Sequence, residues 1–162
     1  MSTPAEEPNL VRVMVGFDFH WAEIDAETFW AKPLGDDRFQ LCNVPFYAYG
    51  LNFGDVVVAH KDEEDEDLLV IDHVERPSGH RTFRIMPSDD GDALALSAAL
   101  EEITELGVGV ERANATLLAI DCPPEVDADE IFDRLEDLVE EGLLEFETCE
   151  RQRDDGFGPM PE

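Results

Sequence analysis

Forty Asp and Glu residues against eleven Lys and Arg give this 162-residue chain a formal net charge of −29. An acidic chain of low hydrophobicity cannot bury enough apolar surface to offset its conformational entropy. Here 43% of the residues are hydrophobic and ten are Phe, so we expect an apolar core beneath an acidic surface. Such a surface repels nucleic-acid phosphates and anionic membranes and attracts basic proteins, so neither a nucleic acid nor a membrane is expected as a partner.

The first half of the chain, residues 11–86, has the patterns of short strands. Val11, Val13 and Val15 alternate with other residues, and a Gly-Asp-Asp turn at 35–37 separates two β-prone runs. Five or six short strands at this spacing predict a small β-barrel-like N-terminal half.

The second half, residues 81–150, changes to helical periodicity. One face of a first helix is predicted to carry Leu96, Leu100, Ile103 and Leu106. A second helix is predicted to begin at the N-cap Asp127, with an apolar face formed by Ile131, Leu135, Leu138 and Val139.

The order of these elements predicts the fold class. With residues 81–86 as a strand shared by both halves, the second half has the order β-α-β-β-α-β, which is typical of the ferredoxin-like fold. The chain is therefore predicted to be an α+β protein. Residues 1–10 and 151–162, which are rich in Pro, Gly and charge, are predicted to be a flexible arm and a flexible tail.

The cysteines and the first residues indicate the compartment. Cys42, Cys122 and Cys149 are odd in number and form no CxxC pair, so free thiols are expected. Residues 1–9 lack the basic and apolar pattern of an export signal, and we expect a cytoplasmic protein. No metal-ligand spacing or phosphate-binding loop is present, so neither a metal nor a cofactor is predicted.

The charge is uneven along the chain. Residues 87–150 contain twenty acids and two bases, against fifteen and seven in residues 11–86. A face meant only for solubility normally mixes both signs. Two hypotheses remain open: adaptation to a salty cytoplasm, where screening removes the repulsion, and a docking face for a basic protein. The predicted docking residues are the acids of the second helix, Asp133, Glu136, Asp137 and Glu140.

Two segments carry a resemblance. Residues 27–58 and 78–85 contain these matching positions: Trp30, Asn43, Pro45, Phe46, Tyr49, Gly54, Asp55, Val57, Gly79, His80, Thr82 and Arg84. The chain resembles the bacterial and archaeal family catalogued as domain of unknown function 4265. The resemblance implies a β-rich front half and an α/β back half. It implies no activity, substrate or cofactor, and it is compatible with an immunity-type protein that neutralises a toxin.

Within the matched segments, His80, Thr82 and Arg84 would share one face of a strand. With Asp55 from another strand, they could bind an anion or perform acid–base chemistry. The alternative is structural, with Asp55 holding Arg84 in a buried ion pair and His80 capping a turn carbonyl. Likewise, Asn43, Phe46 and Tyr49 are candidate binding residues on a loop, and core packing is the alternative for the two aromatic rings.

The chain is thus predicted to be an acidic cytoplasmic binding protein rather than an enzyme. It would dock a basic partner protein through the acidic face of its second helix, as an immunity or inhibitor protein does. The alternative function is ligand binding or hydrolysis at Asp55, His80 and Arg84 in a salt-adapted (halophilic) host.

Overall fold

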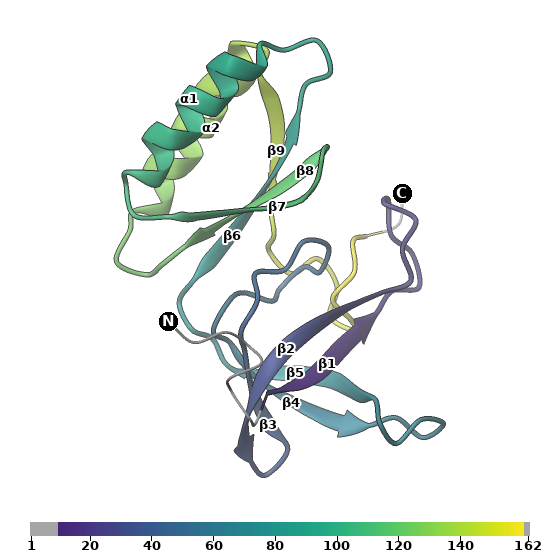
Figure 1. The fold of residues 1–162 in the computed structure, drawn as a ribbon. Helices are drawn as coiled ribbons and strands as arrows, with labels where there is room; N and C mark the ends of the chain where they lie inside the picture. Colours follow the sequence, from purple (N-terminus) through teal and green to yellow (C-terminus); the bar gives the residue numbers. More distant parts are fainter. Residues whose placement is uncertain (1–9, 161–162) are drawn as a thin grey trace. The chain divides into compact units, whose positions relative to one another are not determined.

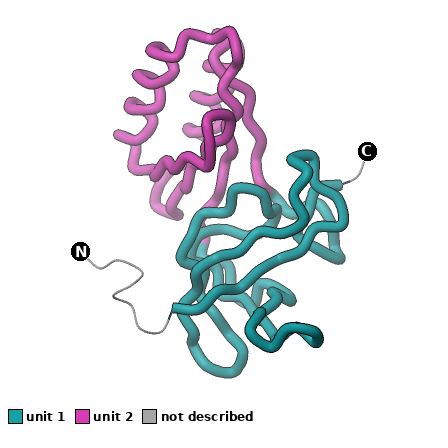
Figure 2. The backbone as a smooth tube through the Cα atoms, turned by 45° about the vertical axis from the view of Figure 1, so that its right-hand side comes forward, with its two compact units in different colours: residues 1–78, 150–162 teal, residues 79–149 magenta. Residues whose placement is uncertain are grey.

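The computed structural model describes residues 10–160, which form two compact units with one sheet each. Unit 1 comprises residues 10–78 and 150–160, and unit 2 comprises residues 79–149 (Figure 2). Both helices belong to unit 2, and the predicted α+β class is confirmed. The arm predicted for residues 1–10 lies outside the described residues, apart from Leu10.

Eleven elements make up the described chain (Figure 1). They are β1 (Val11–Gly16), β2 (Ala26–Gly35), β3 (Arg38–Leu41), β4 (Val56–Lys61), β5 (Leu69–Arg76), β6 (Arg81–Pro87), α1 (Ala93–Thr104), β7 (Gly109–Asn114), β8 (Leu117–Cys122), α2 (Ala128–Glu140) and β9 (Leu144–Thr148). No helix in residues 10–160 is both long enough and apolar enough to cross a membrane.

The strands of unit 1 form a closed barrel in the order β1-β2-β3-β4-β5. Strand β1 closes it by pairing antiparallel with β2 and parallel with β5. Because side chains alternate along a strand, Val13 and Val15 both point into the apolar core, where they join Phe29 and Val57.

The predicted turn between β2 and β3 is present. Gly35, Asp36 and Asp37 all have positive φ, at 90°, 58° and 63°. Glycine adopts this conformation freely, and Asp tolerates it better than most residues, so the Gly-Asp-Asp sequence suits a hairpin of this form.

Residues 150–160 contain no helix or strand, yet they pack on unit 1. Phe157 is only 5% exposed and belongs to the barrel core. The backbone N–H of Tyr49 donates to the Phe157 carbonyl at 2.7 Å. The segment predicted as a flexible tail therefore supplies a core residue. A single aromatic among Gly and Pro has no periodicity from which this could be predicted.

Unit 2 has an antiparallel sheet in the order β7-β8-β6-β9, and α1 and α2 lie side by side on one face of it (Figure 1). Phe83 and Ile85 on β6 face the helices and pack with Ile103 of α1 and Leu135 of α2. The strand predicted at residues 81–86 as shared by both halves is β6, which belongs to unit 2, and the boundary before it falls between residues 78 and 79.

Both helices begin at an Asp N-cap. The predicted cap Asp127 accepts from the N–H of Asp129, and Asp92 caps α1 in the same way. Two residues predicted on the apolar helix faces are partly exposed instead. Leu106 lies beyond the end of α1 at Thr104, and Val139 lies on the flank of α2, next to the buried Leu138.

Candidate functional site

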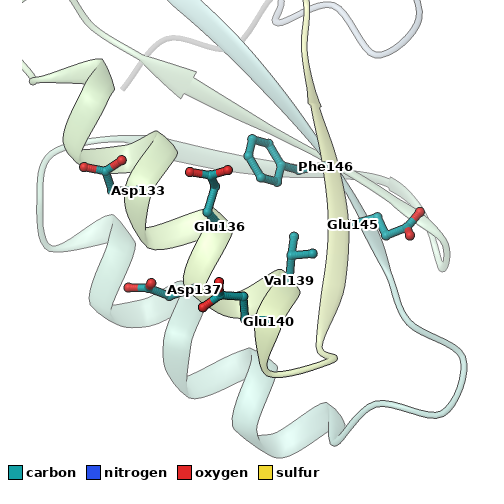
Figure 3. A pocket seen from close by; sticks show the side chains of 7 residues that line it. All are labelled: Asp133, Glu136, Asp137, Val139, Glu140, Glu145 and Phe146. Carbon is teal, nitrogen blue, oxygen red and sulfur yellow. The ribbon is translucent and has the colours of Figure 1, made fainter.

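An open groove of about 530 Å³ runs between α2 and β9 in unit 2 (Figure 3). Its lining residues are Asp133, Glu136, Asp137, Val139, Glu140, Glu145 and Phe146. Four of the five acids come from the solvent side of α2, where helical spacing places them one or two turns apart. Phe146 of β9 points toward α2, whereas Glu145 points to the other side of its strand (Figure 3).

Val139 and Phe146 form an apolar floor in this acidic groove, and Phe132 lies beside Phe146. The ring of Phe132 packs edge-on against Phe146, with centroids 5.3 Å apart. Phe132 and Val139 remain 37% and 39% exposed. An apolar floor rimmed by carboxylates suits a Lys or Arg side chain, whose aliphatic stem packs on apolar surface while its charged head stays at the rim.

Negative charge accumulates at the C-terminal end of α2. Glu140 is the last helical residue and Glu141 is the C-cap, and the last turn contains no base. The helix dipole already places partial negative charge at this end. Arg134 offsets part of the charge, because it contacts Glu102 at 3.0 Å and Asp137 at 3.9 Å. The carboxylates that remain make this end of α2 attractive to a cation.

The structure places all four predicted docking acids, Asp133, Glu136, Asp137 and Glu140, along one groove. Sequence reasoning missed the apolar floor, because Val139 was predicted in the core and Phe132 and Phe146 were not considered. A signal for Phe132 was present: it lies 100° around the helix from Ile131, at the border of the apolar stripe.

His80 and Arg84 each have a carboxylate partner within unit 2. The Nδ1 atom of His80 lies 2.8 Å from the Asp121 carboxylate, and the Nε of Arg84 donates to Glu147 Oε2 at 3.0 Å. Arg84 and Glu147 are directly opposite on β6 and β9, and the Arg84 side chain is 0% exposed. The sheet thus arranges a cross-strand ion pair on the face that points away from the helices.

Asp55, the third candidate, lies in unit 1. Its carboxylate oxygens accept from the backbone N–H groups of Asn52 and Ser78, both at 2.9 Å. These two bonds connect the loop before β4, which contains Asn52, to the segment after β5, which contains Ser78. The pairing of Asp55 with Arg84, and a shared reaction site with His80, stay predictions.

The loop that contains Asn43, Phe46 and Tyr49 is held by side chains. Asn43 Oδ1 accepts from the Trp30 N–H at 2.6 Å, and the Tyr49 hydroxyl accepts from Trp21 Nε1 at 2.7 Å. Tyr49 is buried and Phe46 is half-buried. This packing supports the structural alternative for Tyr49, while a binding role of Phe46 stays a prediction.

Glu27 organises the same loop and was missed from the sequence. Its two carboxylate oxygens accept from three consecutive backbone N–H groups, those of Phe46, Tyr47 and Ala48, at 2.7 to 3.0 Å. Three consecutive N–H groups form a concave anion site, which here is filled by the protein's own carboxylate. In the sequence, Glu27 is recognisable as an acid near the start of a predicted strand, at the beginning of the first matched segment.

His20 is a buried structural residue of unit 1. Its Nδ1 accepts from the Ala22 N–H at 3.0 Å, so the proton is on Nε2, which donates to the Tyr47 carbonyl at 2.8 Å. Both ring nitrogens are therefore engaged by the backbone, and the ring packs on Phe17 and Trp21.

The three cysteines are free; Cys122 and Cys149 are buried and Cys42 is half-buried. Burial, followed by the nearby Asp121 carboxylate, raises the pKa of the Cys122 thiol, which opposes a nucleophilic role. In residues 10–160, no group of three or more His, Cys, Asp or Glu side chains is placed to hold a metal ion.

Comparison with known proteins agrees with the motifs and the fold. Residues 27–146 match the family described as a domain of unknown function (DUF4265), and the chain belongs to this family. A hypothetical protein from Neisseria gonorrhoeae of known crystal structure is 21% identical, with a TM-score of 0.72, over 92% of this chain and 97% of that chain. At this identity the likeness shows the fold alone. No match was found among curated proteins.

Proposed function

We propose that this protein is a binding protein whose acidic groove, between α2 and β9, docks a basic segment of a partner protein. The observation that carries the proposal is the combination of four α2 carboxylates with an exposed apolar floor in one groove. A surface made only for solubility would not place acids of one sign around Val139 and Phe146.

The apolar floor also favours a protein partner over simple ions. Protein interfaces are enriched in aromatic side chains at their centres and polar groups at their rims. Complementary charge speeds association and excludes partners of the wrong sign. An amphipathic basic helix lying in a groove would satisfy both parts of the site. An inhibitor of a basic enzyme, or an immunity protein, would use such a surface, and we expect it to act in the cytoplasm.

The arrangement of unit 2 supports a further structural proposal, that it is a ferredoxin-like domain. Its element order is β6-α1-β7-β8-α2-β9, its strand order is β7-β8-β6-β9, and every pairing is antiparallel. In such a domain α2 is followed by an edge strand, which leaves the groove open along one side.

The docking proposal can be tested with a synthetic amphipathic Lys-Leu helix as the probe, with the full chain titrated by calorimetry. The test variant carries Asp133→Asn, Glu136→Gln, Asp137→Asn and Glu140→Gln. The matched control carries Glu63→Gln, Glu64→Gln, Glu66→Gln and Asp67→Asn in the exposed loop between β4 and β5, so both variants lose four negative charges.

We expect the groove variant to bind the peptide at least about tenfold more weakly, and the loop variant to lose less than about threefold. Binding by the unaltered chain should weaken as KCl is raised, because salt screens complementary charge. Equal losses in the two variants would show that only net charge is sensed, and would contradict the proposal.

A further inference from the structure

The exposed side of the first two turns of α1 carries no charge, in contrast to the exposed side of α2, which carries the groove acids. Residues 93–100 are eight consecutive uncharged residues in a chain with a formal charge of −29. Ala93, Leu94, Ser97 and Ala98 are exposed, and Leu94 is 84% exposed. A solvent-facing helix normally carries its charges on such positions. We propose that this face of α1, defined by these four residues, is a docking surface for a second copy of the same chain.

The same helix also borders a partly apolar hollow. A second groove, of about 390 Å³, is lined by residues of α1 that include Leu96, Leu100 and Glu101, and by Arg112 of β7. Leu94 lies within one turn of Leu96 and less than two turns from Leu100, so α1 presents a projecting leucine close to a hollow. An interface with two-fold symmetry needs both features on one surface, because each copy contributes the same patch to the other.

The charges around this face also fit a second copy. Leu94 follows the acids Asp89, Asp90 and Asp92, and Asp92 caps the helix. When Leu94 of one copy enters the hollow of the other, this acidic helix start approaches the partner's Arg112. Arg112 is exposed, and its Nη1 donates to the backbone carbonyls of Asn114 and Ala115 at 3.3 Å. Its positive charge can therefore meet the incoming carboxylates.

The net charge gives the dimer a particular salt dependence. Two copies at −29 repel each other, and this repulsion is screened as KCl rises. Dimerisation should therefore strengthen with salt, whereas docking of a basic peptide in the acidic groove should weaken. The two surfaces lie on different helices, so either proposal can fail without the other.

The experiment is sedimentation velocity on the full chain over a wide range of protein concentration, at about 10 mM and about 1 M KCl. We expect a concentration-dependent dimer, favoured at the higher KCl concentration. Leu94→Glu should weaken association at least about tenfold, because it removes an apolar contact and adds a charge at a self-contacting site. The matched control is Leu34→Glu, the same change at a partly exposed leucine of unit 1, which should leave association unchanged.

Because Leu94 is exposed, the variant should keep the melting temperature of the parent chain, and Ala98→Glu provides a second change on the same face. A chain that stays monomeric at every concentration and salt level would overturn the proposal. A dimer that survives both Leu94→Glu and Ala98→Glu would overturn it as well, since its interface would lie elsewhere.

Discussion

Arg84 has no exposed side-chain surface, and its Nε donates to the Glu147 carboxylate at 3.0 Å. A guanidinium cannot lose its charge by deprotonation, so burial is tolerated only where partners satisfy it. The ion pair joins β6 to the edge strand β9, which also forms one wall of the acidic groove. The residue thus has a structural part in the sheet that supports the candidate site.

Replacing Arg84 by Ala should lower the free energy of unfolding by about 3 kcal/mol. Breaking a buried ion pair costs about 3–5 kcal/mol. We expect the lower value because the Glu147 side chain is 25% exposed, so its carboxylate is partly solvated. Chemical denaturation followed by circular dichroism measures the change. Arg76→Ala, at an exposed arginine of β5, is the control and should alter stability by no more than about 0.5 kcal/mol. An unchanged stability of Arg84→Ala would show that the ion pair is not structural.

At the scale of elements, α2 combines a favourable start with an unfavourable end. Asp127, Asp129 and Glu130 lie at the N-terminal end, where the helix dipole favours negative charge. Glu140 and Glu141 lie at the C-terminal end, where it does not. The acids at this end of the helix therefore lower the stability of the folded protein. A cationic partner bound at this end would offset the unfavourable charge.

The two ends can be compared by the same change of charge. We expect Glu140→Lys to stabilise the protein by about 0.5–1 kcal/mol relative to Asp129→Lys, because only the first places a cation at the negative end of the dipole. Both positions are exposed, and both variants relieve the net charge equally. Thermal melts at low ionic strength give the difference. Equal melting temperatures, or the reverse order, would contradict this account of α2.

For the whole molecule, the formal charge of −29 predicts a strong response to salt. Like-charge repulsion destabilises the compact state and is screened by added ions. If the acidic surface is an adaptation to a salty cytoplasm, the melting temperature should rise steeply between about 10 mM and about 3 M KCl, a range that extends beyond complete screening. A flat response would reject salt adaptation and leave partner docking as the reason for the acids.

Much of the fold could be predicted from local patterns. Alternation at Val13 and Val15, the Gly-Asp-Asp turn and the Asp127 cap are each set by a few neighbouring residues, whose periodicity and backbone preferences act locally. The four groove acids were predicted for a similar reason, since they are the solvent side of one amphipathic helix. Glu27 and Phe157 could not be predicted, because each acts on residues distant in the chain and neither belongs to a periodic pattern.

The sequence alone determined that the chain folds, that strands precede helices, which side of α2 faces the sheet, and which family the chain belongs to. The three-dimensional arrangement was needed to find the apolar floor of the groove. Hydrophobic periodicity indicates the direction of the core but not how far the sheet extends beneath a helix. Because β9 is the edge strand, the sheet ends there, and Val139 and Phe132 on the flank of α2 stay partly open to solvent.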